Sequence, residues 1–428
     1  MRRKLATALA LLLAAVLLSA CGAGSTSSDN GSVTLTLESW RTEDTQLWES
    51  KILPAFYEEH PGIKIDFTPT KAENYDPTLT SKLKGGTAGD IITCRSYDEL
   101  RRTAAAGYLA PVDGLKGLDN FSKLTLDAWS GADGKRYCVP MASVTAGVYY
   151  NKAIFDELGL KVPTTTAEFV ADLKAIKADG KYAPLAQGTG TQPAWDLSYL
   201  MLSNLGQNYY HGEQGRLGLI DGSKKVTDPE FVSALKMVDD LRPYFPRNYQ
   251  SMTVDDARTL FTLGQAAMYI SGSFEIAGLA DAPFKIGVFA PPVQNKGDQL
   301  YVQDHPDIAV GMNARTKHPK QVREFLQWIA SPEFSKIYVN ALPGFLPMQT
   351  KPVALDNDLA KQFADIRKSA KVSPRLGLDR LSAGDPNFEL EIMRLMQKML
   401  NSDDVTPEDV AKELQSGLER WYGPQKKH

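Results

Sequence analysis

The chain has 428 residues, and its 51 acidic and 48 basic side chains give it a net charge of −3 at pH 7. A weakly acidic surface argues against nucleic acid as a partner and against electrostatic adhesion to anionic lipids. The length exceeds what a single hydrophobic core organises and therefore favours two lobes.

The N-terminal segment has the features of a secretion signal. Three basic residues at positions 2–4 precede an apolar run from Leu5 to Leu18, which is shorter than the ~20 apolar residues of a membrane span but typical of a secretory signal. The sequence Leu18-Ser19-Ala20-Cys21 resembles the lipoprotein box of bacteria. This resemblance implies that residues 1–20 are removed and that Cys21 is lipidated. Losing those three positive charges changes the net charge from −3 to −6. A cleaved signal with an incidental cysteine is the alternative.

No later stretch is apolar for long enough to span a bilayer, so we expect attachment to the cell membrane through lipid only, outside the cytoplasm. Residues 22–32 are rich in Gly, Ser and Thr and are expected to form a flexible tether. The two remaining cysteines, Cys94 and Cys138, either form a disulfide there or stay as separately buried thiols. These cysteines and five scattered histidines show no metal-ligand spacing, and we expect no metal and no cofactor.

The first half of the folded chain alternates strand and helix patterns. Apolar and polar residues alternate in the strand segments, and Pro54 is expected to kink the first helix. The predicted strands cover 33–38, 63–67 and 90–93, and the predicted helices cover 42–60 and 77–84. This order with short connections predicts a parallel sheet with helices on both faces.

The second half continues with clear helix boundaries. Thr165 and Glu168 form a capping box for a helix that Gly180 ends, and Pro332 and Pro407 each follow an N-cap residue. Helices are predicted over 151–158, 165–180 and 254–263, and a strand over 266–270. No repeat of 20–50 residues is visible, which disfavours solenoids and propellers.

Five segments stand out in chain order: LTLESW at 35–40, GGTAGDII at 85–92, GKRYCVP at 134–140 with YYNK at 149–152, FTLGQAAMYISGSF at 261–274 and VREFLQWIASPEF at 322–334. Together they resemble the sugar-binding proteins of bacterial ABC importers, the family 1 group that includes the maltose-binding proteins. The chain departs from many relatives at Gly89, at Gln265 and at Phe274, where they often have Pro, Lys and Trp. The last departure changes the stacking surface and therefore ligand identity, but not the class.

The resemblance implies an α/β, two-lobed periplasmic-binding-protein-like fold with parallel-rich sheets and three interlobe crossings. These are expected near Pro140, Pro291-Pro292 and Pro343-Gly344. The first lobe would take 33–141 plus 302–342, and the second 142–301 plus 343–428. The implied function is to bind a mono- or oligosaccharide between the lobes by hinge closure and deliver it to ABC permease subunits. We expect a monomer that catalyses nothing.

A sugar needs aromatic platforms for its ring faces and polar groups for its hydroxyls. In an open parallel sheet such groups belong beyond the carboxyl ends of the strands. The candidates there are Glu38, Trp40, Arg41, Asp44, Arg95, Tyr97, Asp98, Phe274 and Glu275. Further candidates are Trp195 in a loop, Tyr149 on a crossing strand, and Asp304 and Phe345 in crossing loops.

Each candidate also has a purely structural interpretation. Trp40, Phe274 and Trp195 could be core aromatics, and Arg41 with Asp44 could be a solvated i,i+3 pair. Arg95 and Asp98 could begin a surface helix, and Glu275 could be a first-turn carboxylate. Of Tyr149 and Tyr150, which alternate on a strand, at most one should face the cleft.

Three other functions compete with sugar binding. A cluster of tyrosines at 149, 150, 209 and 210 keeps open a same-fold protein for a polyamine, an iron chelate or a glycerophosphodiester. A secreted glycoside hydrolase would use paired carboxylates, but the Gly-x-Ser-x-Gly, His-Glu-x-x-His and Gly-x-x-x-x-Gly-Lys motifs are absent from the sequence. A surface-interaction lipoprotein would have no ligand cleft.

Overall fold

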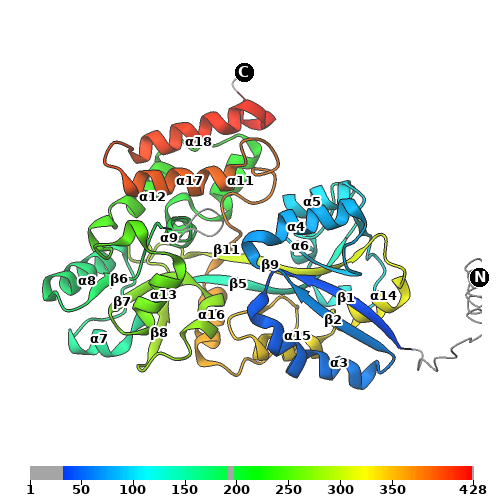
Figure 1. Cartoon of the computed structure of the whole chain (residues 1–428). Helices are drawn as coiled ribbons and strands as arrows, with labels where there is room; N and C mark the ends of the chain where they lie inside the picture. Colours follow the sequence, from blue (N-terminus) through cyan, green and yellow to red (C-terminus); the bar gives the residue numbers. More distant parts are fainter. Residues whose placement is uncertain (1–31, 191–196, 427–428) are drawn as a thin grey trace, which may run out of the picture.

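One curled sheet connects the two halves of the computed structural model, which describes residues 32–190 and 197–426 (Figure 1). Its strands are β1 (Val33–Ser39), β2 (Ile63–Pro69), β3 (Ile91–Cys94), β4 (Leu109–Ala110), β5 (Cys138–Asn151), β6 (Ala183–Leu185), β7 (Ala266–Gly272), β8 (Ile286–Phe289), β9 (Tyr301–Asn313), β10 (Leu346–Pro347) and β11 (Lys371–Ser373). The main order is β2-β1-β3-β9-β5-β7-β6. Strand β1 pairs in parallel with both β2 and β3, and β6 pairs in parallel with β7. The central strands β9 and β5 are antiparallel to each other, β9 is antiparallel to β3, and β5 is antiparallel to β7.

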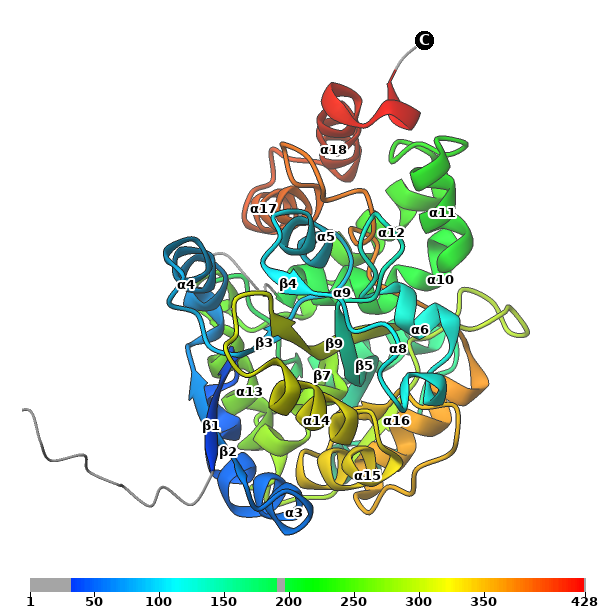
Figure 2. The same ribbon diagram turned by 90° about the vertical axis from the view of Figure 1, so that its right-hand side faces the viewer.

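Helices flank the sheet in both halves. Those of the first lobe are α2 (Thr45–Leu47), α3 (Leu53–Glu59), α4 (Ala72–Gly85), α5 (Asp98–Ala105), α6 (Lys123–Asp127), α14 (Pro319–Ile329) and α15 (Pro332–Ala341). Those of the second lobe are α7 (Lys152–Glu157), α8 (Thr166–Asp179), α9 (Leu197–Leu205), α10 (Gln207–Tyr210), α11 (Glu213–Asp221), α12 (Pro229–Asp239), α13 (Val254–Thr262), α16 (Asp358–Ser369), α17 (Phe388–Asn401) and α18 (Pro407–Trp421). Figure 2 shows α4 and α5 above the strands of the first lobe and α3, α14 and α15 below them. Within the described ranges, no helix is both long and apolar enough to cross a membrane.

Separate hydrophobic cores define the two lobes. In the first, the alternating apolar residues of β1, such as Leu35 and Leu37, pack with Phe325 of α14. In the second, α17 and α18 pack with α9 and α12 around residues such as Met396. Burial of these apolar faces is the main term that stabilises each lobe. This architecture agrees with the predicted two-lobed α/β fold.

The strands β5 and β9 run through both lobes and pair with each other along most of their length (Figure 1). Val139 lies opposite Val310 in the first lobe, and Thr145 lies opposite Asp304 nearer the second. Between them the register shifts at Ala142, an irregularity of the kind that bends a strand. A third connection leaves the first core after Met348. The lobes are therefore joined at a narrow, bent region.

A disulfide joins Cys94 at the end of β3 to Cys138 at the start of β5. Both strands pair with β9, where Gly311 lies opposite Cys138 of β5 and opposite Ile92, two residues before Cys94, of β3. A Cβ atom at Gly311 would lie 2.7 Å from the sulfur of Cys138 and 3.0 Å from that of Cys94. The glycine therefore provides the space through which the disulfide passes over β9.

The predicted helix over 42–60 is present but is not uniform. A 3₁₀ turn at Thr42–Asp44 and the short α2 lead into a π-helical turn at Trp48–Ile52 before α3. Pro54, which has no N–H, follows this turn at the start of α3, so the distortion lies where the proline interrupts the hydrogen-bond ladder.

The predicted start of the next helix at Pro77 is wrong, because α4 begins at Ala72 and includes that proline. A proline in the second turn removes one helical hydrogen bond. The longer helix buries Tyr75, whose hydroxyl donates to the carbonyl oxygen of Thr93 at 2.8 Å. The buried ring and its hydrogen bond offset the proline.

Candidate functional site

Two chambers lie between the lobes and meet at shared residues. The aromatic chamber, of about 170 Å³, is lined by Trp40 and Phe274 among others, and the charged chamber, of about 380 Å³, by side chains such as Glu99 and Arg102. Ala72, Arg95, Asp307 and Arg375 line both chambers. We call these four residues the junction. Together the chambers have the size of an ordinary small-molecule site, ~300–1,000 Å³.

Trp40 follows β1 and is held as a fixed ring in the wall of the aromatic chamber. Tyr75 meets it edge-on with ring centroids 5.5 Å apart, and the guanidinium carbon of Arg95 lies 4.0 Å from the Trp40 ring centroid. Arg95 in turn forms an ion pair with Asp76 of α4 at 3.3 Å. Such a cation over an indole face is attracted by the ring quadrupole. Trp40 therefore sets the position of Arg95 at the junction.

Arg41 also lines the aromatic chamber, and its guanidinium group is already bound. It donates to both carboxylate oxygens of Asp44, at 2.9 Å for the outer nitrogen, and pairs with Glu43 at 3.2 Å. Its guanidinium carbon lies 4.5 Å from the ring centroid of Phe345. Burial raises the pKa of Asp44, although Arg41 opposes the shift. Asp44 and Phe345 therefore support Arg41 and do not line either chamber themselves.

Phe274 provides the aromatic surface of the second lobe. It follows β7 and packs against hydrophobic cores of both lobes, while its side chain remains partly exposed. A Cβ atom at Gly272 would lie 2.5 Å from the Phe274 ring. Because residue 272 has no side chain, the ring rests directly against the backbone of the strand.

The junction combines cations with a carboxylate. Asp307 lies on β9 with its side chain one-fifth exposed. Burial raises its pKa, and the charges of Arg41, Arg95 and Arg375 lower it. A carboxylate of this kind accepts hydrogen bonds from hydroxyl groups, and the neighbouring guanidinium groups donate to them.

The charged chamber is lined by side chains that bind one another. Arg375 pairs with Glu389 at 2.9 Å, and Arg102 pairs with Glu99. His305 is buried, and burial, followed by the charges of Arg375 and Arg95, holds its pKa well below the ordinary range. The imidazole is therefore neutral at pH 7. Asp98 also lines this chamber.

Two predicted site residues, Glu38 and Glu275, line neither chamber and are bound within their own lobes. Glu38 is buried, accepts from Lys82 at 2.9 Å and from the amide of Gly89, and lines neither chamber. Glu275 is bound by Arg258 at 2.5 Å and by the Tyr269 hydroxyl at 3.2 Å. A buried carboxylate needs such partners, and each of these two carboxylates finds them within its own lobe.

Three more candidates lie outside both linings. Tyr149 is fully buried in the second lobe, and its hydroxyl donates to the carbonyl oxygen of Gly272 at 2.8 Å. Asp304 accepts from Thr145 at 2.6 Å and pairs with Arg367 at 3.1 Å, so it ties the crossing strands together. Tyr97 is buried beside α5. Tyr149 thus forms no part of either chamber wall, and Trp195 and Cys21 lie outside the described residues.

Sequence reasoning missed Asp307, Arg375, Asn204 and Gln303, all of which line a chamber. Asn204 on α9 donates to the carbonyl oxygens of Gly147 and Ser271, both at 2.8 Å, and so joins two strands at the chamber wall. A signal for Asp307 and Gln303 was present in the sequence. The crossing strand β9 is largely buried yet carries a run of polar residues, which is unusual for a strand inside a core.

Comparison with known proteins gives one family and many relatives. A model of the family described as bacterial extracellular solute-binding protein matches residues 39–335. The multiple sugar-binding protein of Streptococcus mutans is 28% identical over 97% of this chain and 96% of its own length. The melibiose/raffinose/stachyose-binding protein MelE of Bacillus subtilis is 21% identical over 94% and 93%.

Solved structures share the fold over almost the whole chain. A chitin oligosaccharide binding protein superposes with a TM-score of 0.77 at 24% identity, covering 91% of this chain and 98% of that protein. The binding protein RafE in complex with raffinose gives a TM-score of 0.74 at 24% identity, covering 92% and 100%. These likenesses establish the two-lobed fold.

Proposed function

The chain belongs to the family of bacterial extracellular solute-binding proteins, and from this membership we propose that it binds a carbohydrate and delivers it to an ABC importer. The family and the relatives named above are binding proteins. The ligand is a mono- or oligosaccharide, the partners are the permease subunits of the importer, and the protein catalyses no reaction. It acts as a monomer.

The observation that carries the proposal is the cleft itself. Trp40 and Phe274 bring aromatic rings from different lobes to one chamber, and Arg95 and Asp307 stand beside it at the junction. The aromatic ring faces suit the CH face of a sugar. Arg95 can donate hydrogen bonds to sugar hydroxyl groups, and Asp307 can accept hydrogen bonds from them. The relatives named for sugars support the same ligand class.

The alternative of a polyamine, iron-chelate or glycerophosphodiester receptor rested on four tyrosines. None of Tyr149, Tyr150, Tyr209 and Tyr210 lines the aromatic or the charged chamber. A sugar therefore remains the better ligand class for this cleft.

Binding couples to closure because the chamber walls come from both lobes. The lobe boundaries of this proposal are 33–141 plus 302–342 and 142–301 plus 343–428, although Phe345 and Met348 still pack in the first core. Ligand contacts both walls only when the lobes are together, so it shifts the population toward the closed state. The bend in β5 and β9 at Ala142 supplies the hinge, and the permease recognises the closed form.

The proposal places the protein outside the cytoplasm on a lipid anchor. Leu18-Ser19-Ala20-Cys21 supplies the lipidation signal, and residues 22–32 supply the tether. The disulfide between Cys94 and Cys138 fits an oxidising compartment.

The test is a thermal-shift and calorimetric screen of mono- to tetrasaccharides, with spermidine and glycerophosphocholine included. A true ligand at 100 times its Kd stabilises the folded state by about 2.7 kcal/mol. Asp307→Asn should weaken binding roughly tenfold, about 1.4 kcal/mol, because a charged acceptor is lost. Asp66→Asn, on the exposed edge strand β2, is the matched control and should bind normally. Binding of spermidine alone, or of no sugar, would overturn the assignment.

A further inference from the structure

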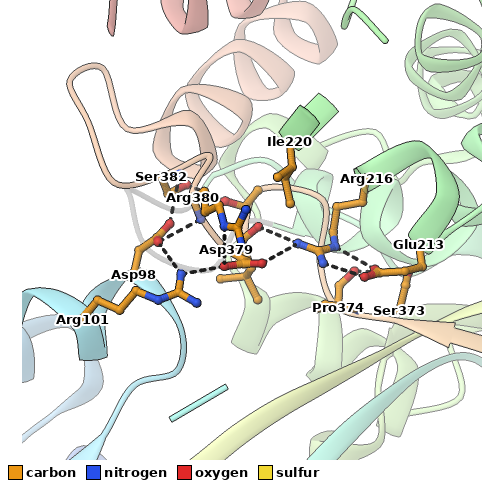
Figure 3. Close-up of polar contacts among 12 residues, drawn as sticks. Asp98, Arg101, Glu213, Arg216, Ile220, Ser373, Pro374, Asp379, Arg380 and Ser382 are labelled. Atoms are coloured by element: carbon orange, nitrogen blue, oxygen red, sulfur yellow. Dashed lines mark hydrogen bonds and ion pairs between the residues drawn. The ribbon is translucent and has the colours of Figure 1, made fainter. Parts of the chain in front are cut away.

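A chain of charged side chains joins the first lobe to the second at the end of the charged chamber (Figure 3). Arg101 of α5 pairs with Asp379 at 2.6 Å. Asp379 lies 3.8 Å from Arg216 of α11, which pairs with Glu213 at 2.7 Å. The series therefore runs from a helix of the first lobe to a helix of the second.

The segment 374–382 lies in the middle of this series and contacts both lobes. Its Leu376 and Leu381 belong to the core of the second lobe, while Leu378 packs in the core of the first. Arg375, Leu378 and Ser382 line the charged chamber. The segment thus forms one wall of the chamber while it bridges the two bodies.

The side chain of Asp98 holds the turn in segment 374–382 by binding backbone amides of that segment. Its carboxylate accepts from the amide of Arg380 at 2.9 Å and from that of Ser382 at 3.3 Å (Figure 3). Asp379 and Arg380 have φ values of 60° and 73°, a region that residues other than glycine rarely adopt. A left-handed turn at two successive residues presents its amides together, and Asp98 of the other lobe binds them.

Both ends of the series are fixed in their own lobes. The amide of Tyr97, just before Asp98, donates to the carbonyl oxygen of Ala128 at 2.7 Å. On the other side, Arg216 is buried and also donates to the carbonyl oxygen of Leu378 at 3.0 Å. Asp98 is buried as well. Charges shielded from water in this way attract each other more strongly than surface pairs.

We propose that segment 374–382 is an interlobe strap, and that Asp98 and Arg101 are positioning residues that fasten it when the lobes close. Opening the cleft separates α5 from the strap and exposes these charges to water. The strap therefore favours the closed state before ligand arrives and slows release afterwards. The effect on ligand release rests on the proposed function, whereas the effect on the empty protein does not.

The first measurement uses the full chain without ligand. Fluorescent labels on the two lobes report the closed fraction, and small-angle scattering reports the radius of gyration, at low and high salt. Salt should lower the closed fraction of the wild type, because dissolved ions stabilise the charges that opening exposes to water more than charges that stay shielded. Arg101→Gln and Asp379→Asn should be more open at low salt and should respond less to added salt. The double variant should open less than the sum of the two single effects, because both substitutions remove the pair between Arg101 and Asp379.

The second measurement is the release rate of the best sugar from the screen. Arg101→Gln should release it roughly tenfold faster, because truncating one member of a shielded charge pair acts mainly on dissociation. Arg101→Lys, which keeps the charge, should recover part of this loss.

Arg394→Gln is the matched control. Arg394 pairs with Glu391 and Glu413, so it joins two carboxylates within the second lobe alone. Unchanged closure and release in Arg101→Gln and Asp379→Asn, or equal changes in Arg394→Gln, would overturn the strap. If no sugar binds but the empty variants open as described, the strap stands and the ligand assignment falls.

Discussion

The aromatic and charged chambers meet at one junction, but their side chains are held in different ways. Trp40 is wedged between Tyr75 and Arg95, and Phe274 rests against the backbone at Gly272. In the charged chamber Arg375 and Arg102 are each paired with a carboxylate. The Phe274 ring, which is held by packing alone, has no charged partner to give up when ligand enters, whereas a paired charge must exchange one partner for another.

This difference assigns the chambers unequal shares of the binding energy. Burial of a ligand face against a preformed ring is a net gain, because little further ordering is needed. Exchange of ion pairs for hydroxyl contacts comes close to balance. The aromatic chamber should therefore set affinity, and the charged chamber should adjust it.

The strongest test of the unequal contributions of the two chambers to binding energy is Phe274→Ala. The variant removes the aromatic surface of the second lobe without touching an ion pair. We expect roughly 30- to 100-fold weaker sugar binding, about 2–3 kcal/mol, as for other buried aromatic anchors. Calorimetry on the sugar identified by the screen measures it, and Tyr57→Ala, on α3 and outside both chambers, is the control. Full affinity in Phe274→Ala would break the comparison.

A smaller effect is expected from Arg102→Gln in the charged chamber. About half of the Arg102 side chain is exposed, and its partner Glu99 is similarly accessible. Such surface pairs contribute ~0–1 kcal/mol, so affinity should fall by no more than about twofold to threefold, and less at high salt. Titrations at two ionic strengths check this. A loss as large as that of Phe274→Ala would mean that the charged chamber dominates binding.

The smallest effect on affinity should come from Asp172→Asn on α8, which lies in neither chamber. Burial, with the charge of Glu168, raises the pKa of Asp172 to about 6. The folded state therefore binds this proton more tightly than the unfolded state, so stability from this group is present at pH 4 and is lost as pH rises through 6. The variant should flatten that part of the pH profile in thermal unfolding and leave sugar affinity unchanged.

Three of the candidates that the sequence places after strand ends line a chamber in the structure. Trp40, Arg95 and Phe274 follow β1, β3 and β7, and each lines a chamber. The same rule also selected Glu38 and Glu275, because periodicity cannot distinguish a carboxylate that faces ligand from one bound within its own lobe. The deciding partners, Lys82 and Arg258, come from helices whose packing has no local sequence signal.

Three of the four residues that sequence reasoning missed, Gln303, Asp307 and Arg375, come from the later part of the chain. Arg375 reaches the junction because β11 pairs with β9, a contact between segments about 70 residues apart. Asp307 lies within β9, a region that the sequence indicated only as a connection between the lobes. Local propensity predicted the caps of α8 and α18, Thr165 and Thr406, correctly. Capping depends on neighbouring residues, whereas the junction depends on tertiary pairing.

The disulfide beneath which β9 passes at Gly311 has a mechanical consequence. Both of its cysteines lie on the first-lobe side of the bend at Ala142. The covalent link therefore stiffens the first-lobe end of the hinge without connecting the two lobes to each other. The angle between the lobes can still change while the disulfide is formed. A hinge motion needs a rigid base on one side, and here the disulfide makes the first-lobe side of the hinge that base.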